Sequence, residues 1–138
     1  MEKVEKVEIA QQTLLAFLDK INNWNVYAAQ YIKSNGFNTQ IKKELIEPLK
    51  EILEKYCTEK LSKDVSASCS EISGYDIHFL SIDKYEIVTK NKICFFITES
   101  NRSKSTYRYT MIYRDEKWRI DQKQVFRKFN NKWEKSYI

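Results

Sequence analysis

Asp76 and His78 are the residues of this chain best suited to acid–base chemistry. They lie two positions apart in the segment YDIHFL, which alternates like a β-strand and would place both side chains on one face. A carboxylate can orient an imidazole and raise its basicity, so the pair could act as a general base. The alternate positions Tyr75, Ile77 and Phe79 are more apolar and are expected to face the core. We therefore favour a pair that faces water, since this spacing alone fixes no catalytic geometry.

Basic side chains gather in the last third of the sequence. Residues 102–135 carry eleven Lys and Arg against four Asp and Glu, whereas residues 1–101 carry thirteen against fifteen. Five cations of the late strands are expected to point outward: Arg108, Arg114, Arg119, Lys123 and Arg127. Such a face would suit an acidic protein surface, because complementary charge speeds association and arginines often anchor interfaces. A face that simply contacts water is the alternative. Nucleic acid is not favoured, because the aromatic rings are expected on the other face and acidic residues are interspersed.

Aromatic residues at helical and strand spacing form a third set. Its members are Trp24, Tyr27, Tyr31, Tyr107, Tyr109 and Tyr113. Rings with polar tips can line a pocket for a small apolar ligand. A helix stripe facing one side of a strand is more often plain core, so both interpretations stay open.

Several kinds of site lack the residues that they need. The chain has two Gly and one Pro, and neither a GxGxxG nor a GxxxxGK phosphate motif occurs. Cys57, Cys69 and Cys94 are widely spaced and accompany a single His. This pattern indicates reduced thiols in a cytosolic protein, and neither a metal nor another cofactor is expected. The charged start is not a secretory signal, and no apolar run reaches membrane-spanning length.

The spacing of apolar residues predicts helices first and strands afterwards. Helices are expected over residues 2–61. One long helix reaches residue 34, and two short helices, 39–46 and 48–61, then meet at Pro48, with Asn38 or Thr39 as the cap of the first of them. A serine-rich connector covers residues 62–73.

The sheet is predicted to cover residues 74–137, with its centre in a hairpin within residues 105–133. There Tyr107, Tyr109, Met111 and Tyr113 alternate with Arg108, Thr110, Ile112 and Arg114. The apolar run CFFI, residues 94–97, is expected in a strand that is buried on both faces. This order predicts a single α+β domain over residues 1–138, with N-terminal helices packed on a curved antiparallel sheet of five to six strands. Such a sheet would make a cone with a pocket.

Three segments resemble a known fold. They are FLDKINNWNVYAAQY in the first helix, YRYTMIYRDEKWRIDQKQVF in the hairpin and NNKWEKSYI at the end. Together with the proline-broken second helical region, the first two resemble the nuclear transport factor 2-like (cystatin-like) conical fold. The last segment is similar to a bacterial branch of that fold, the immunity proteins of polymorphic toxin systems.

The resemblance implies a cytoplasmic, non-catalytic antitoxin that binds and neutralises a cognate toxin, through the basic sheet face or the rim of the cone. Enzymes of this fold place Asp and His in the cone for dehydration or isomerisation. The alternative function is therefore a small-molecule enzyme or carrier using Asp76, His78 and the aromatic pocket. A dimerising accessory domain is a further possibility, since open sheets of this shape often pair face to face into a homodimer.

Overall fold

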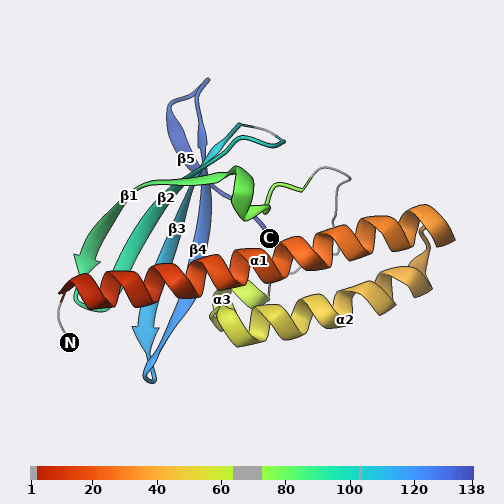
Figure 1. The fold of residues 1–138 in the computed structure, drawn as a ribbon, viewed down its shortest axis with the longest axis horizontal. Helices are drawn as coiled ribbons and strands as arrows, with labels where there is room; N and C mark the ends of the chain where they lie inside the picture. The colour runs from red at the N-terminus through yellow and green to blue at the C-terminus, as the bar shows by residue number, and fades with distance from the viewer. Residues whose placement is uncertain (1–2, 64–72, 103) are drawn as a thin grey trace.

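The computed structural model describes residues 3–63, 73–102 and 104–138. Figure 1 shows the N-terminal helices followed by one sheet. The helices are α1 (Lys3–Asn35), α2 (Thr39–Tyr56), α3 (Glu59–Ser62) and a 3-10 helix, η1 (Ile77–Phe79). The strands are β1 (Leu80–Thr89), β2 (Lys92–Glu99), β3 (Thr106–Arg114), β4 (Lys117–Arg127) and β5 (Lys132–Lys135). This order confirms the predicted α+β class. Residues 64–72 of the predicted connector, and the predicted helix start at residue 2, lie outside the described residues.

α1 is one helix of 33 residues, as its apolar spacing predicts. Leu14, Phe17 and Ile21 are at most 1% exposed and lie on the same stripe. Burying each side chain of this size stabilises the fold by about 1.5–3 kcal/mol. The helix ends at Asn35, and the next residue, Gly36, has a φ of +79° that suits a residue without Cβ. Its N–H donates to the carbonyl of Ile32 at 2.7 Å.

α2 is continuous through Pro48, so the predicted division into helices 39–46 and 48–61 is wrong. Pro48 lies on the exposed side of the helix. The carbonyl that loses its N–H donor there can bond to water instead, which lowers the cost of the proline. The predicted cap is confirmed at Asn38, whose Oδ1 accepts the N–H of Ile41 at 2.9 Å. None of the described helices is long and apolar enough to span a bilayer.

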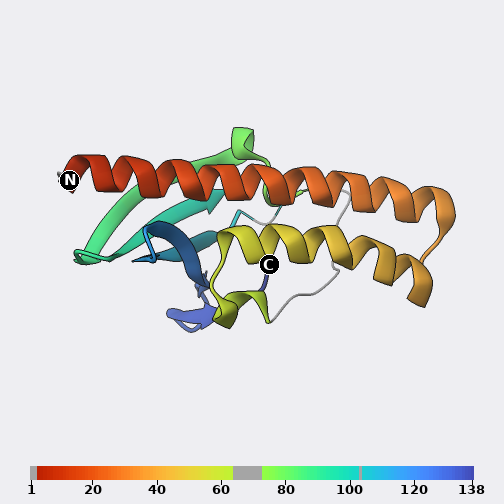
Figure 2. The same cartoon turned by 90° about the horizontal axis from the view of Figure 1, so that it is seen from below.

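The five strands form one antiparallel sheet in the order β1-β2-β3-β4-β5. Figures 1 and 2 show α1 crossing one face of this sheet, with α2 lying alongside α1. We call this the inner face and the opposite side the outer face. Buried inner-face side chains join those of the helices in the core: Ile93, Phe95, Ile97, Tyr109, Met111, Trp118 and Ile120.

β3 and β4 form the predicted hairpin. Its two turn residues, Asp115 and Glu116, have φ values of 55° and 64°, the left-handed pair typical of a two-residue hairpin turn. Tyr109 and Met111 are 3% and 0% exposed. The ring-bearing side of the hairpin therefore faces the core, as expected. The predicted double-sided burial of residues 94–97 in β2 is also confirmed.

The segment before β1 is not the predicted strand. Residues 77–79 form η1, and the Asp76 carboxylate caps it by accepting the N–H of His78 at 3.0 Å. Ile77 and Phe79 are 37% and 44% exposed, so their expected place in the core is wrong. An aspartate side chain can bond to a backbone N–H two residues later, so Asp76 can start a turn as readily as it can continue a strand.

A β-bulge in β4 determines which side chains reach each face of the hairpin. Thr110 pairs with Gln122 and Met111 with Ile120, which leaves Asp121 as the extra residue. Because strand side chains alternate, one extra residue moves every later side chain of β4 to the opposite face. Residues beyond the bulge therefore lie on the faces opposite to those that simple alternation predicts.

Candidate protein-binding face

The outer face of the sheet carries most of the basic side chains of the strands. Residues that pair across strands point to the same face, so the register assigns each side chain. The outer-facing cations are Lys84, Lys92, Arg108, Arg114, Lys117, Arg119 and Lys135. Among the described strand residues, Asp83 and Glu86 supply the carboxylates of this face. The outer face is therefore strongly positive.

Aromatic rings lie among these cations and form what we call the tryptophan cluster: Phe96, Arg108, Phe126 and Trp133. The Trp133 ring centre is 5.2 Å from that of Phe126 and 5.8 Å from that of Phe96. The guanidinium of Arg108 lies 4.6 Å from the Trp133 ring centre and donates to Gln124 Oε1 at 2.7 Å. A stacked guanidinium is attracted by the ring and is held in place before any partner arrives.

The sequence interpretation expected no aromatic rings on this face, which is wrong. Phe126 and Trp133 reach the outer face because both follow the bulge at Asp121. Phe96 belongs to the apolar run that was predicted to be buried on both sides of β2. That run was the one sequence signal for a ring on the outer face.

Lys123 is not an outward-facing cation, contrary to expectation. It pairs with Tyr109 on the inner face and is 5% exposed. Its ammonium donates to the hydroxyl of Tyr75 at 3.0 Å and to the carbonyl of Tyr137 at 3.2 Å. Three tyrosine ring centres, including that of Tyr107, lie 4.7–5.9 Å from it.

The other four predicted partner-binding residues are divided between the faces. Arg108, Arg114 and Arg119 lie on the outer face. Arg127, like Lys123, follows the bulge and has inner-face parity, and its Nε is 3.1 Å from a carboxylate oxygen of Glu134. The expected outward placement is therefore wrong for Lys123, and Arg127 does not share a face with the other arginines.

Asp76 and His78 do meet, but at the surface. His78 Nδ1 lies 3.0 Å from Asp76 Oδ1, and the His78 side chain is 84% exposed. The pKa of Asp76 is lowered, chiefly because its carboxylate accepts the backbone N–H of His78 and then because it bonds to the ring. Neither residue lines the two hollows described below. Asp76 caps η1 by accepting the N–H of His78, and this capping role needs no substrate.

The three aromatic residues proposed from the first helix belong to α1, and two of them bond to α2. Trp24 is 6% exposed, and its indole N–H donates to the carbonyl of Leu45 at 2.8 Å. Tyr27 is 55% exposed, with its ring centre 5.8 Å from that of Tyr31. The Tyr31 hydroxyl bonds to Glu44 at 3.0 Å, and this carboxylate raises the pKa of Tyr31.

The three strand tyrosines lie elsewhere. Tyr107 and Tyr109 surround Lys123, while the Tyr113 ring centre is 5.3 Å from that of Trp118. Desolvation raises the pKa of buried Tyr109 well above its usual range. The structure therefore distributes the six aromatic residues over three places rather than one pocket.

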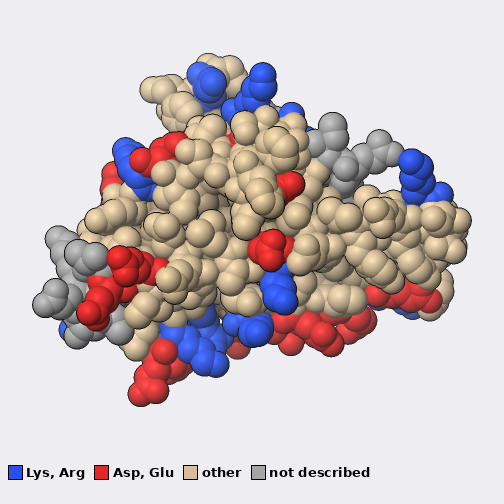
Figure 3. Space-filling view, in the orientation of Figure 1, with Lys and Arg blue, Asp and Glu red and all other residues tan. Residues whose placement is uncertain are grey.

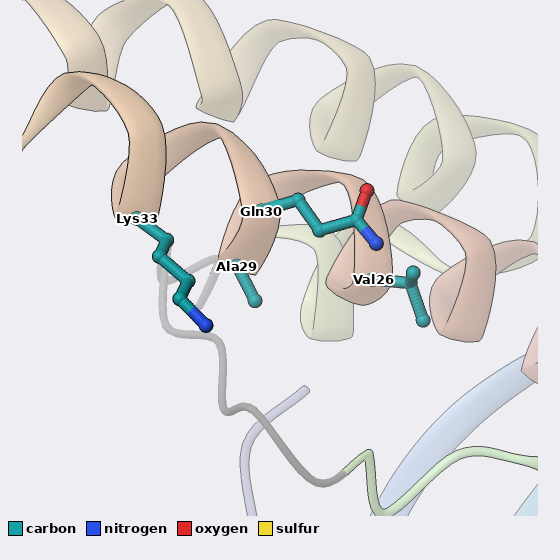
Figure 4. Close-up of a pocket in the computed structure, with 4 residues that line it drawn as sticks. All are labelled: Val26, Ala29, Gln30 and Lys33. Atoms are coloured by element: carbon teal, nitrogen blue, oxygen red, sulfur yellow. The ribbon is translucent and has the colours of Figure 1, made fainter.

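Of these six aromatic residues, Tyr113 lines one of two open hollows, and the other five line neither. A groove of about 420 Å³ between α1, α2 and the β3–β4 turn is lined by Ile9, Thr13, Lys55, Tyr56, Tyr113, Glu116, Lys117 and Trp118. A smaller hollow of about 240 Å³ lies against α1, where Figure 4 shows Val26, Ala29, Gln30 and Lys33 on one side of the helix. Neither set converges polar groups on one point, as a catalytic site requires.

The helix-covered side of the molecule has a different character from the outer face. Figure 3 shows it in the orientation of Figure 1, with most charged side chains around its margin and a mainly uncharged surface over α1 that a few charged side chains interrupt. In residues 9–32 of α1 the charged residues are Asp19 and Lys20. Charge recognition is therefore better supported on the outer face of the sheet than on this side.

Thiols and metal ligands add no further site in the part of the chain that is described. Cys57 and Cys94 are free and buried, and Cys69 lies outside the described residues. No group of three or more His, Cys, Asp and Glu in the described ranges could hold a metal ion. Burial raises the pKa of the Cys57 thiol far above its usual range, which keeps it protonated and unreactive.

Comparison with known proteins identifies the family. The family model described as NTF2 fold immunity protein matches residues 9–137. The chain belongs to this family. It is 30% identical over 129 residues to Immunity protein RhsIA of Dickeya dadantii (strain 3937), a match that covers 90% of this chain and 92% of the relative. No solved structure matches the chain.

Membership of the NTF2 fold immunity proteins confirms the predicted resemblance and, with it, the prediction of a toxin-neutralising immunity protein. The helices packed on a five-stranded antiparallel sheet agree with that fold. An immunity protein acts on a toxin, so a partner surface is the kind of site that this family requires.

Proposed function

We propose that this immunity protein neutralises its toxin by direct, non-catalytic binding through the outer face of the sheet. The toxin would present an acidic surface to the seven outer-facing cations and cover the tryptophan cluster. Its active site or substrate channel would be blocked sterically by the bound sheet. To bind its toxin, the protein must be in the compartment where the toxin acts, and we infer that this compartment is the cytoplasm.

The stacking of Arg108 on Trp133 carries this proposal. Tryptophan and arginine are the residues most enriched among interface positions that dominate binding energy. Here they stack at 4.6 Å, with Phe96 and Phe126 beside the tryptophan. A preformed aromatic and cationic centre surrounded by charge is the arrangement expected of a protein-binding hot spot.

The charges around the cluster would guide the toxin to this face. Cations on one surface with few carboxylates accelerate encounter with an acidic partner, and the acceleration falls as salt is added. Arg114 is exposed and Arg119 is partly exposed, so both are available to a partner. Lys123 and Arg127 are left out of the proposed contact because of where the bulge places them.

The experiment is a binding titration with the cognate toxin, using a double charge reversal. Arg114→Glu with Arg119→Glu is expected to slow association about tenfold or more, and to abolish growth protection when the toxin is co-expressed. Lys42→Glu with Lys43→Glu is the matched control, because it makes the same charge change on exposed positions of α2. Equal effects of the two pairs would show that the toxin does not read the outer face.

A further inference from the structure

β1 is a long edge strand. It pairs with β2 along one edge, and its other edge has no neighbouring strand among the described residues. It contains ten residues, whereas β5 at the other edge contains four. Figure 1 shows β1 at one margin of the sheet, with α1 crossing the sheet rather than running beside that edge. The outward N–H and C=O groups of such a strand can pair with another strand.

Apolar side chains are exposed along and just before this edge. Tyr85 and Val88 of β1 are 49% and 53% exposed, and Phe79 precedes them at 44%. Proteins commonly protect an edge with inward-pointing charge, and the residue that could do so is Asp83 at the β1 bulge. The Asp83 carboxylate instead bonds to the hydroxyls of Ser81 and Thr98 on its own sheet, so it does not block the edge.

The charge pattern of β1 is complementary to itself. Lys84 and Glu86 flank Tyr85, and both project from the outer face. Their charged atoms are 3.9 Å apart, and the side chains are 62% and 57% exposed. If two copies of β1 paired antiparallel about Tyr85, Lys84 of each copy would lie opposite Glu86 of the other. Directly opposed unlike charges stabilise a strand pair, and like charges destabilise it.

We propose that a second copy of this chain pairs with β1, so that two sheets join into one ten-stranded sheet around a two-fold axis at Tyr85. The two Tyr85 rings would lie side by side on the inner face of the joined sheet, and the two Lys84–Glu86 pairs would lie on its outer face. An isologous contact of this kind closes on itself and does not propagate. It also leaves both outer faces open, so each copy could still hold one toxin.

The test uses two single charge reversals of the full chain and measures mass by sedimentation over a range of concentrations. Lys84→Glu places four carboxylates around the axis, and Glu86→Lys places four ammonium groups there. Each variant alone is expected to raise the dimer Kd about tenfold or more, equivalent to about 1.4 kcal/mol. Mixed in equal amounts, the two variants are expected to form a heterodimer at least as tightly as wild type, because each then meets opposite charge.

The mixture separates pairing between chains from effects within one chain. Within each variant, residues 84 and 86 carry like charges, so only a partner chain can restore complementarity. Arg127→Glu and Glu134→Arg are the matched control, since they reverse an exposed pair between β4 and β5 and should leave wild-type dimerisation unchanged. A monomeric wild type, a mixture that stays monomeric, or a β1 edge protected from hydrogen exchange only by bound toxin would each overturn the proposal.

Discussion

The ammonium of Lys123 lies 3.0 Å from the hydroxyl of Tyr75, a residue 48 positions earlier in the chain. The same ammonium donates to the carbonyl of Tyr137. One buried cation thus joins β4 to the segment before η1 and to the C-terminal residues. Tyrosine rings around it replace part of the water that a charge loses on burial. This lysine is best understood as a structural tie within the inner half of the molecule.

Replacing this tie is expected to destabilise the fold. Lys123→Met keeps most of the packing volume but leaves the Tyr75 hydroxyl and the Tyr137 carbonyl without their donor. The free energy of unfolding should fall by about 1–3 kcal/mol, measured by urea denaturation. Arg127→Met is the control and should change it by less than about 0.5 kcal/mol, because that side chain is exposed. A larger loss in the control would contradict the placement of the two residues.

The buried thiol of Cys57 predicts a pH dependence of stability. Burial raises its pKa in the folded protein, whereas the unfolded chain should titrate near the ordinary value of about 8.5. Above that pH the unfolded state loses a proton that the folded state keeps, so stability is full below it and falls as pH rises.

The matched variant for this test is Cys57→Ala, which removes the titrating group. Between about pH 8 and pH 10, wild type should lose about 2 kcal/mol more unfolding free energy than the variant, because other groups cancel in the comparison. Parallel curves for the two proteins would show that the thiol ionises equally in both states.

The large elements of the fold can be predicted from the spacing of apolar residues, because each element is long enough to repeat that spacing several times. α1 and the β3–β4 hairpin were predictable for this reason. Pro48 was misjudged because a proline's cost depends on whether its side of the helix meets water, which no local pattern reveals. The aspartate cap of η1 was mistaken for the polar position of a strand.

The candidate binding face was only partly predictable, for a more specific physical reason. Alternation assigns Arg108, Arg114 and Arg119 correctly, since β3 has no extra residue and Arg119 precedes the extra residue of β4. A bulge has no strong sequence signature, yet it inverts everything after it. That single residue explains both the buried Lys123 and the unexpected exposure of Trp133 to the outer face.

Trp133 is expected to dominate toxin binding if the outer face is the contact. Trp133→Ala should weaken binding by about 2 kcal/mol or more, roughly a 30-fold rise in Kd, measured by calorimetry. Arg108→Ala should weaken binding less in the Trp133→Ala variant than in the wild type, because the two side chains stack and act together.

The control for this experiment is Phe129→Ala. Phe129 is 87% exposed in the β4–β5 turn and lies outside the tryptophan cluster. Its removal should leave Kd unchanged within about twofold, since isolated exposed rings contribute little to a contact centred elsewhere. Should Phe129→Ala weaken binding as much as Trp133→Ala, the contact is centred on the turn instead of the cluster.

Hydrogen bonds from the segment between α2 and α3 hold the β4 bulge in place, and their contribution to stability can be measured. The Thr58 hydroxyl donates to Asp121 Oδ1 at 2.9 Å, and the Thr58 N–H donates to the carbonyl of Ile120 at 3.0 Å. A double-mutant cycle of Thr58→Val and Asp121→Ala should give a coupling of about 1 kcal/mol in unfolding free energy. Lys60→Met removes the longer 3.7 Å pair to the same carboxylate and should cost less than about 0.5 kcal/mol, since that ammonium is largely in water. If Lys60 couples to Asp121 more strongly than Thr58 does, charge rather than the buried hydroxyl holds the extra residue of β4 in place.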